Sequence, residues 1–164
     1  MKYNAYEIIE MAKKMERNAA LFYEKASQQV ENQKVKNLLS DLAKMEKVHE
    51  VVFDDLKNLF SDAEWANMNI SSDNEMLRYL ESMADVIVFN WKMDEKEIGN
   101  MSDIDYVFRF AIGKEKESVL YYMGIKQLVP ETLGKDKIEE IIKEEMKHVA
   151  ILSDVWKQYS KKSN

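Results

Sequence analysis

Residues 46–49 read Glu-Lys-Val-His, and residues 145–148 read Glu-Met-Lys-His. These two Glu-x-x-His motifs contain the only two histidines of the chain. A spacing of three residues places the Glu and the His of each motif on one face of a helix, close enough to share a metal ion. Because a single such motif is also ordinary on an exposed helix, the residues around the motifs decide their meaning.

Both motifs lie on apolar helix faces. Apolar residues recur at steps of three and four, and this pattern predicts four helices over about 5–30, 35–60, 103–129 and 136–160. Six positions on these faces carry Glu or His instead: Glu16, Glu46, His49, Glu115, Glu145 and His148. A buried carboxylate costs several kcal/mol unless it is paired or binds a metal. Six such positions indicate one common cause, a metal site.

The second half of the chain repeats the first half with an offset of 99 residues. The matched pairs include Glu16 with Glu115, Tyr23 with Tyr122, Glu46 with Glu145, His49 with His148, and Ala12 with Ala111. Such internal similarity predicts two copies of one helical hairpin and a site with pseudo-two-fold symmetry. Glu16 and Glu46 are each 15 residues from residue 31 in the first turn, which is ~22 Å along a helix. The four Glu and two His are therefore expected in one layer at mid-height.

The segment between the hairpins has a different character. Residues 61–102 form a long crossover, in which residues 71–73 (Ser-Ser-Asp) are suited to cap a shorter helix that ends near Phe89. The four Gly and one Pro of the chain are too few for a protein of many turns. The expected fold is all-α, a single domain over residues 1–164 in which a four-helix bundle of two antiparallel hairpins is joined by one long crossover, the connectivity of ferritin-like folds.

Composition excludes several other classes. The net charge of −6 disfavours nucleic-acid binding, and the absence of Cys excludes disulfides, iron–sulfur clusters and thiol nucleophiles. No apolar run reaches the roughly 18 residues of a membrane-spanning helix. A cytoplasmic protein without a membrane partner is expected.

The six-residue pattern resembles that of the ferritin-like di-iron carboxylate proteins. Residues 15–23 and 114–122 resemble the first and third helices of rubrerythrins. The resemblance implies two iron ions, or manganese or zinc, bridged by Glu46 and Glu145, with Glu16 and Glu115 as terminal carboxylates and His49 and His148 each on one metal. Tyr23 and Tyr122 would donate hydrogen bonds to these carboxylates, or would simply be core aromatics. Glu144 would orient the His of the other hairpin.

The resemblance has two departures. Rubrerythrins carry an extra Glu three residues after the third-helix ligand, where this chain has Ser118, and Ala19 stands at the related place after Glu16. A rubredoxin domain is missing, since there is no Cys. The resemblance implies a homodimer that reduces hydrogen peroxide or dioxygen in oxidative stress, with electrons from a separate donor such as a rubredoxin. The alternatives are a ferroxidase or iron-handling protein, and a non-catalytic helical interaction module.

Overall fold

The computed structural model describes residues 5–59, 75–90, 99–129 and 134–161. It contains helices α1 (Ala5–Gln29), α2 (Gln33–Asn58), α4 (Glu75–Asn90), α6 (Ile104–Leu128) and α7 (Lys135–Ser160). The described residues contain no strand, so the all-α prediction is confirmed. The crossover helix α4 ends at Asn90, next to its predicted end, whereas its predicted cap at residues 71–73 lies outside the described residues.

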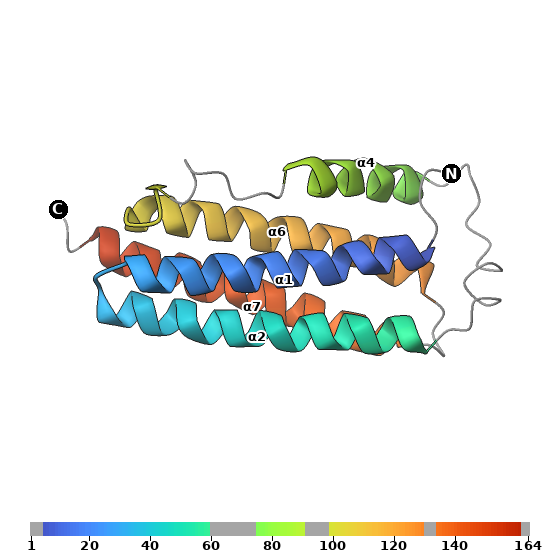
Figure 1. Cartoon of the computed structure of the whole chain (residues 1–164), viewed down its shortest axis with the longest axis horizontal. Coiled ribbons are helices and arrows are strands. Elements are labelled where there is room, and N and C mark those ends of the chain that lie inside the picture. Colours follow the sequence, from blue (N-terminus) through green and yellow to red (C-terminus); the bar gives the residue numbers. More distant parts are fainter. Residues whose placement is uncertain (1–4, 60–74, 91–98, 130–133, 162–164) are drawn as a thin grey trace.

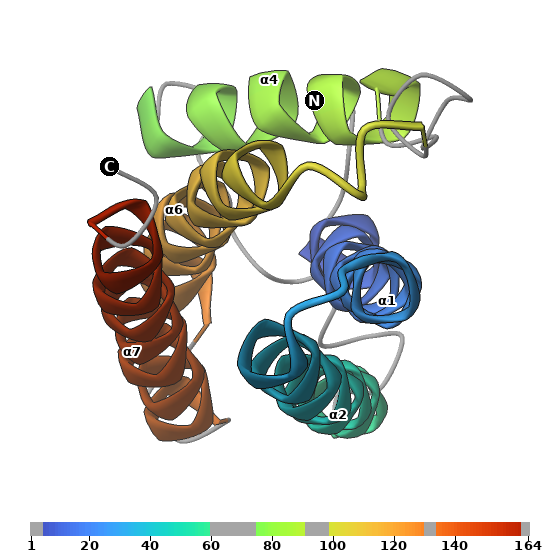
Figure 2. The same cartoon turned by 90° about the vertical axis from the view of Figure 1, so that its left-hand side faces the viewer.

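The four long helices form an elongated bundle (Figure 1). Seen along the bundle, α1 and α2 form one side, α6 and α7 form the other, and α4 lies across α1 and α6 (Figure 2). The chain direction reverses within each hairpin, and the hairpins face each other through α1 with α6 and α2 with α7. The predicted bundle of two antiparallel hairpins is therefore confirmed. None of the described helices is long and apolar enough to cross a membrane.

Side-chain caps fix the start of two helices. The side chain of Asn32 accepts hydrogen bonds from the backbone N–H groups of Lys34 (3.0 Å) and Val35 (3.2 Å). Asp103 does the same for Asp105 (2.9 Å) and Tyr106 (3.3 Å). Each cap satisfies two of the donors that a helix leaves free at its first turn. The starts of α2 and α6 are thus set by one side chain each.

Two glycines mark close approaches between elements. Gly134, before α7, has φ +99°, and a Cβ there would clash with the Cδ2 atom of Leu56 on α2. Gly124 on α6 allows the approach of α4, since its Cβ would lie 2.8 Å from the Cδ2 atom of Leu80. The absence of a side chain at these positions lets α7 begin against α2 and lets α4 pack directly on α6.

The core is divided into two apolar clusters along the bundle. One cluster contains Ile8, Phe53 and Ile138 and is extended by Leu80 of α4, and the other contains residues such as Val30. The six Glu and His positions lie between these clusters along each helix. The bundle therefore holds one polar layer between two apolar halves.

Candidate metal centre

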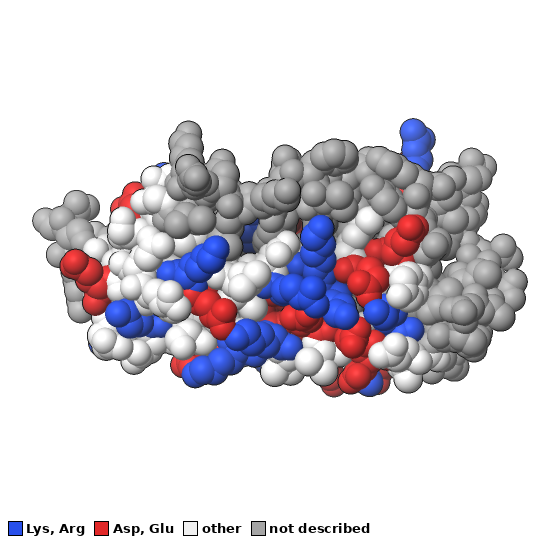
Figure 3. Space-filling view, in the orientation of Figure 1, with Lys and Arg blue, Asp and Glu red and all other residues white. Residues whose placement is uncertain are grey.

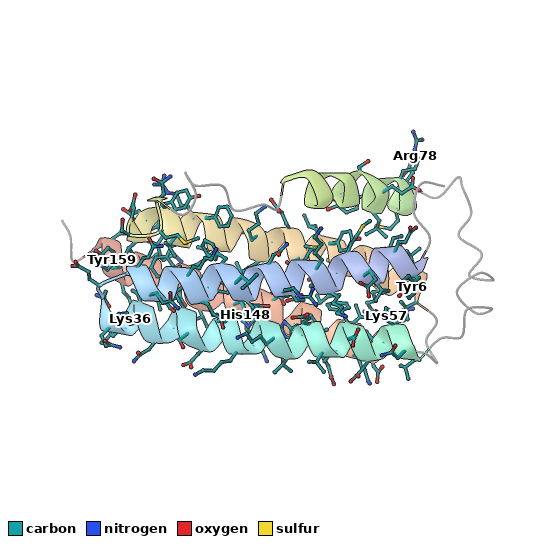
Figure 4. The ribbon with its side chains drawn as sticks, in the orientation of Figure 1. Tyr6, Lys36, Lys57, Arg78, His148 and Tyr159 are labelled. Carbon is teal, nitrogen blue, oxygen red and sulfur yellow. The ribbon has the colours of Figure 1, made fainter. Side chains whose placement is uncertain are left out.

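The four long helices each present part of the polar layer. The exposed fractions of the six side chains are 1% for Glu16, 1% for Glu46, 2% for His49, 3% for Glu115, 0% for Glu145 and 0% for His148. Figure 4 shows His148 near the middle of the bundle's length. The structure thus buries all six predicted positions and brings them together, as the two-hairpin geometry predicts.

The six side chains form two overlapping groups. The first group, called here the His49 position, contains Glu16, Glu46, His49 and Glu145. The second group, the His148 position, contains Glu46, Glu115, Glu145 and His148. In each group the potential ligand atoms all lie within 4.8 Å of one another. Glu46 and Glu145 belong to both groups, so their carboxylates are placed to bridge two cations.

The Nδ1 atoms of the two imidazoles point into these groups. His49 Nδ1 lies 2.8 Å from Glu145 Oε1 and 3.3 Å from Glu46 Oε2. His148 Nδ1 lies 3.1 Å from Glu46 Oε1 and 3.4 Å from Glu145 Oε2. The two rings are stacked with centroids 5.7 Å apart. Both imidazoles therefore face the shared carboxylates with the same ring nitrogen.

The two buried tyrosines connect the hairpins. The Tyr23 hydroxyl donates to Glu115 Oε1, and the Tyr122 hydroxyl donates to Glu16 Oε1. Each tyrosine thus holds a carboxylate of the hairpin to which it does not belong. Burial, together with these carboxylates, raises the pKa of both phenols well above the ordinary value, so both remain donors at neutral pH.

The terminal and shared carboxylates are in different electrostatic states. Burial raises the pKa of Glu16 and Glu115 well above the usual range, and the nearby Glu145 and Glu46 charges add to the effect. Burial acts in the same direction on Glu46 and Glu145, but the nearby imidazoles of His148 and His49, together with Glu115 in the case of Glu145, outweigh it and lower the pKa values of both carboxylates. The shared pair is therefore ionised first.

The imidazoles carry the compensating charge in the absence of a metal. Burial disfavours the charged form of His148, yet the carboxylates of Glu115, Glu145 and Glu46 outweigh burial and raise its pKa to about 12. The pKa of His49 is raised in the same way, by Glu145, Glu16 and Glu46. A metal at either Nδ1 must replace a proton, because a ligating imidazole is neutral.

The donor set fits two divalent cations. Glu46 Oε1, both carboxylate oxygens of Glu145 and both ring nitrogens of His148 are buried without a well-formed hydrogen bond. Such atoms are rare in folded proteins and call for a missing partner. Four carboxylates would balance the charge of two divalent cations, and oxygen with imidazole nitrogen suits iron, manganese or zinc.

The outer nitrogens of the two imidazoles differ. His49 Nε2 lies 2.7 Å from Glu144 Oε2, across the hairpin boundary. The sequence suggests this contact, since Glu144 directly precedes a shared carboxylate. His148 Nε2 is buried and has no hydrogen-bond partner among the described residues. Sequence reasoning missed this difference, although Met45, 99 residues before Glu144, is a visible signal of it.

A small cavity reaches the polar layer between α1 and α6. Its lining includes Tyr23, Glu115, Ala19 and Ser118. The cavity has room for about one water molecule. Ser118 is the position at which the resemblance to rubrerythrins leads one to expect an extra Glu, and Ala19 is the related position after Glu16. The small side chains of these two residues leave this space beside Glu115.

Comparisons with known proteins agree with this architecture. Residues 1–57, which contain α1 and nearly all of α2, match the Rubrerythrin family model. A crystal structure from Thermotoga maritima, described as that of a ferritin-like diiron-carboxylate protein, matches with a TM-score of 0.68 and 18% identity, over 94% of this chain and 95% of that chain. The sequence matches no curated protein.

Proposed function

We propose that this ferritin-like bundle, whose first hairpin matches the Rubrerythrin family model, is a di-iron oxidoreductase that reduces hydrogen peroxide to water. The observation that carries this proposal is the pair of overlapping, buried Glu and His groups that share Glu46 and Glu145. Two iron ions would be held at the His49 and His148 positions. When bound, they would supply the two electrons that the reduction of one peroxide molecule to two water molecules requires.

The residues of the chain provide the setting for this chemistry. The shared carboxylates keep two cations close together, and the apolar clusters on both sides exclude bulk water. Tyr23 and Tyr122 hold the terminal carboxylates in place through their hydroxyl protons. The cavity beside Glu115 leads toward the layer and admits only a very small molecule. This size favours peroxide or dioxygen over an organic substrate.

The electrons that restore the reduced state would come from a separate protein such as a rubredoxin. The chain has no Cys with which to hold an iron–sulfur centre of its own. Without a donor, the protein would complete one oxidation of its two ions and stop. With a donor, it would consume peroxide continuously.

The test uses protein loaded with Fe(II) and mixed with peroxide under anaerobic conditions. Glu46→Ala combined with Glu145→Ala removes both shared carboxylates and should abolish the rapid oxidation of bound iron, seen in the absorbance of the ferric product. Glu140→Ala, an exposed residue of α7, is the matched control and should react like the wild type. Oxidation that is as fast in the double variant as in the wild type would refute the proposal.

A ferroxidase is the second candidate function, and one observation favours it: Ala19 and Ser118 carry no carboxylate. Without an extra Glu, the six-residue set is symmetric and gives oxidised iron no additional carboxylate, which suits a ferroxidase that releases its iron as product. The two functions differ in the fate of the metal. In a peroxidase about two iron ions per chain remain bound after many turnovers, whereas a ferroxidase loses them. Absence of bound transition metal altogether would leave a non-catalytic helical module.

A further inference from the structure

The two halves of the polar layer differ at one contact. His49 donates from its outer nitrogen to the carboxylate of Glu144, at 2.7 Å, and that carboxylate comes from α7 of the other hairpin. The outer nitrogen of His148 is buried and has no hydrogen-bond partner among the residues that the structure describes. The internal repeat places Met45 where a counterpart of Glu144 would be.

The remaining contacts are matched across the repeat. Each inner ring nitrogen faces the shared carboxylates and one terminal carboxylate, at 3.6 Å from Glu16 for His49 and 3.6 Å from Glu115 for His148. Each terminal carboxylate accepts a hydrogen bond from one buried tyrosine. Among the side-chain contacts, the difference between the His49 position and the His148 position therefore rests on Glu144.

A carboxylate on the outer nitrogen changes an imidazole ligand in two ways. It holds the proton on Nε2, which leaves the lone pair of Nδ1 free for a metal, and it fixes the orientation of the ring. Loss of such a contact typically weakens metal binding by about 10- to 100-fold. The side chain of Glu144 is 44% exposed, so solvent screens part of its charge and the lower end of that range applies.

We infer that the two metal positions are unequal and that the His49 position binds its ion about 10-fold more tightly than the His148 position, with Glu144 as the positioning residue. This inference rests on the proposed di-metal function. It means that the protein with one ion per chain holds that ion at the His49 position. The ion at the His148 position would then be the one that exchanges.

Binding of two ions in two steps is not enough to test this inference, because ions that share carboxylates also repel each other in a symmetric site. The positions are therefore measured one at a time, by calorimetric titration with Co(II). His148→Ala leaves the His49 position, and His49→Ala leaves the His148 position. We expect Co(II) to bind about 10-fold more tightly to the first variant than to the second.

Glu144→Gln provides the decisive comparison. It should weaken Co(II) binding about 10-fold in the His148→Ala background and have no effect in the His49→Ala background, where its partner is missing. Met45→Glu in the His49→Ala background should strengthen binding, since it supplies the missing carboxylate to His148. Glu140→Gln, which also removes one exposed negative charge from α7, is the control and should change neither background.

The outcomes separate the inference from the proposed function. Equal Co(II) affinities of the two single-His variants, or an equal effect of Glu144→Gln in both backgrounds, would overturn the inference while leaving a di-metal protein. Failure of the wild type to bind Co(II), Fe(II) or Mn(II) would overturn both. Helical circular dichroism of each variant tests whether the bundle is intact. Met45→Glu and Glu144→Gln are not expected to change the helical signal of their backgrounds, because the side chains of Met45 and Glu144 are 38% and 44% exposed.

Discussion

The two hairpins present matching groups to the interior and different groups to solvent. Across α1 and α2, Lys13 pairs with Asp54 at 2.5 Å, Arg17 pairs with Glu50 at 2.6 Å, and Lys47 and Lys57 pair with Glu24 and Glu10. Figure 3 shows Lys, Arg, Asp and Glu side chains interspersed over this face. Across α6 and α7 the described contacts include one ion pair at a different position, Lys126 with Glu139 at 2.7 Å, and a hydrogen bond that the Trp156 indole donates to Asp105.

This difference indicates which positions of the sequence are constrained. The six Glu and His positions must place ligand atoms within a few ångströms of each other, so the two copies agree there. Outward positions only have to be soluble and compatible with a helix, so the copies diverge. Substitutions at matched positions of the two hairpins therefore measure how far the interior equivalence extends.

The largest effect is expected in the apolar core, where the copies differ in volume. Phe53 is fully buried, and the centroid of its ring lies 4.8 Å from that of Tyr122. The residue that matches Phe53 in the second hairpin is the smaller Leu152. Phe53→Ala should lower the free energy of unfolding by about 4 kcal/mol and Leu152→Ala by about 3 kcal/mol, measured by urea denaturation. Phe53→Leu, which copies the second hairpin, should cost only about 1 kcal/mol. Equal losses for both alanine variants would show that ring packing adds nothing.

An intermediate effect is expected at the tyrosines. Tyr23→Phe and Tyr122→Phe each remove the donor to one terminal carboxylate. Metal affinity should fall about 10-fold in each variant, or about 1.4 kcal/mol, and by the same factor in both, since the two contacts are equivalent. Competition with a chelator of known affinity provides the measurement. A loss of metal affinity in only one variant would show that the two tyrosine contacts are not equivalent.

The smallest effect is expected at the surface ion pairs. Arg17→Met and Lys126→Met should each lower the free energy of unfolding by about 0.5 kcal/mol, because solvent screens exposed pairs. The loss should diminish in high salt. Lys44→Met, whose pair with Asp41 lies within one helix and is more exposed, is the reference and should be close to neutral. A loss above 2 kcal/mol at Arg17 would mean that charge contacts, rather than packing, hold the first hairpin together.

Much of this architecture follows from periodicity. The bounds of α1 and α6 could be predicted closely because their apolar residues recur regularly. The sequence offers both Ser102 and Asp103 as caps for α6, and the structure uses Asp103. The burial of Glu16 and Glu115 could be predicted because both stand where an apolar residue is expected. The offset of 99 residues then relates the two hairpins without any knowledge of tertiary structure.

Contacts that depend on helix rotation and on neighbouring elements could not be predicted. The cavity at Ala19 and Ser118 exists because α1 and α6 approach with small side chains facing each other, and spacing along one helix does not reveal this. The packing of α4 against Gly124 depends on the path of the crossover, most of which has no periodic pattern. The ion-pair partner of Arg17 could not be predicted either, because several acidic residues lie on α2.

The polar layer between the two apolar clusters also sets the alignment of the hairpins. Leu and Ile side chains alone would allow one hairpin to slide past the other by a helical turn, about 5.4 Å, with little change in buried apolar area. In this chain such a slip would move Glu46 and Glu145 into contact with rings and methyl groups and leave buried charges without partners. The side chains that would gather a pair of ions therefore also specify a single register for the fold.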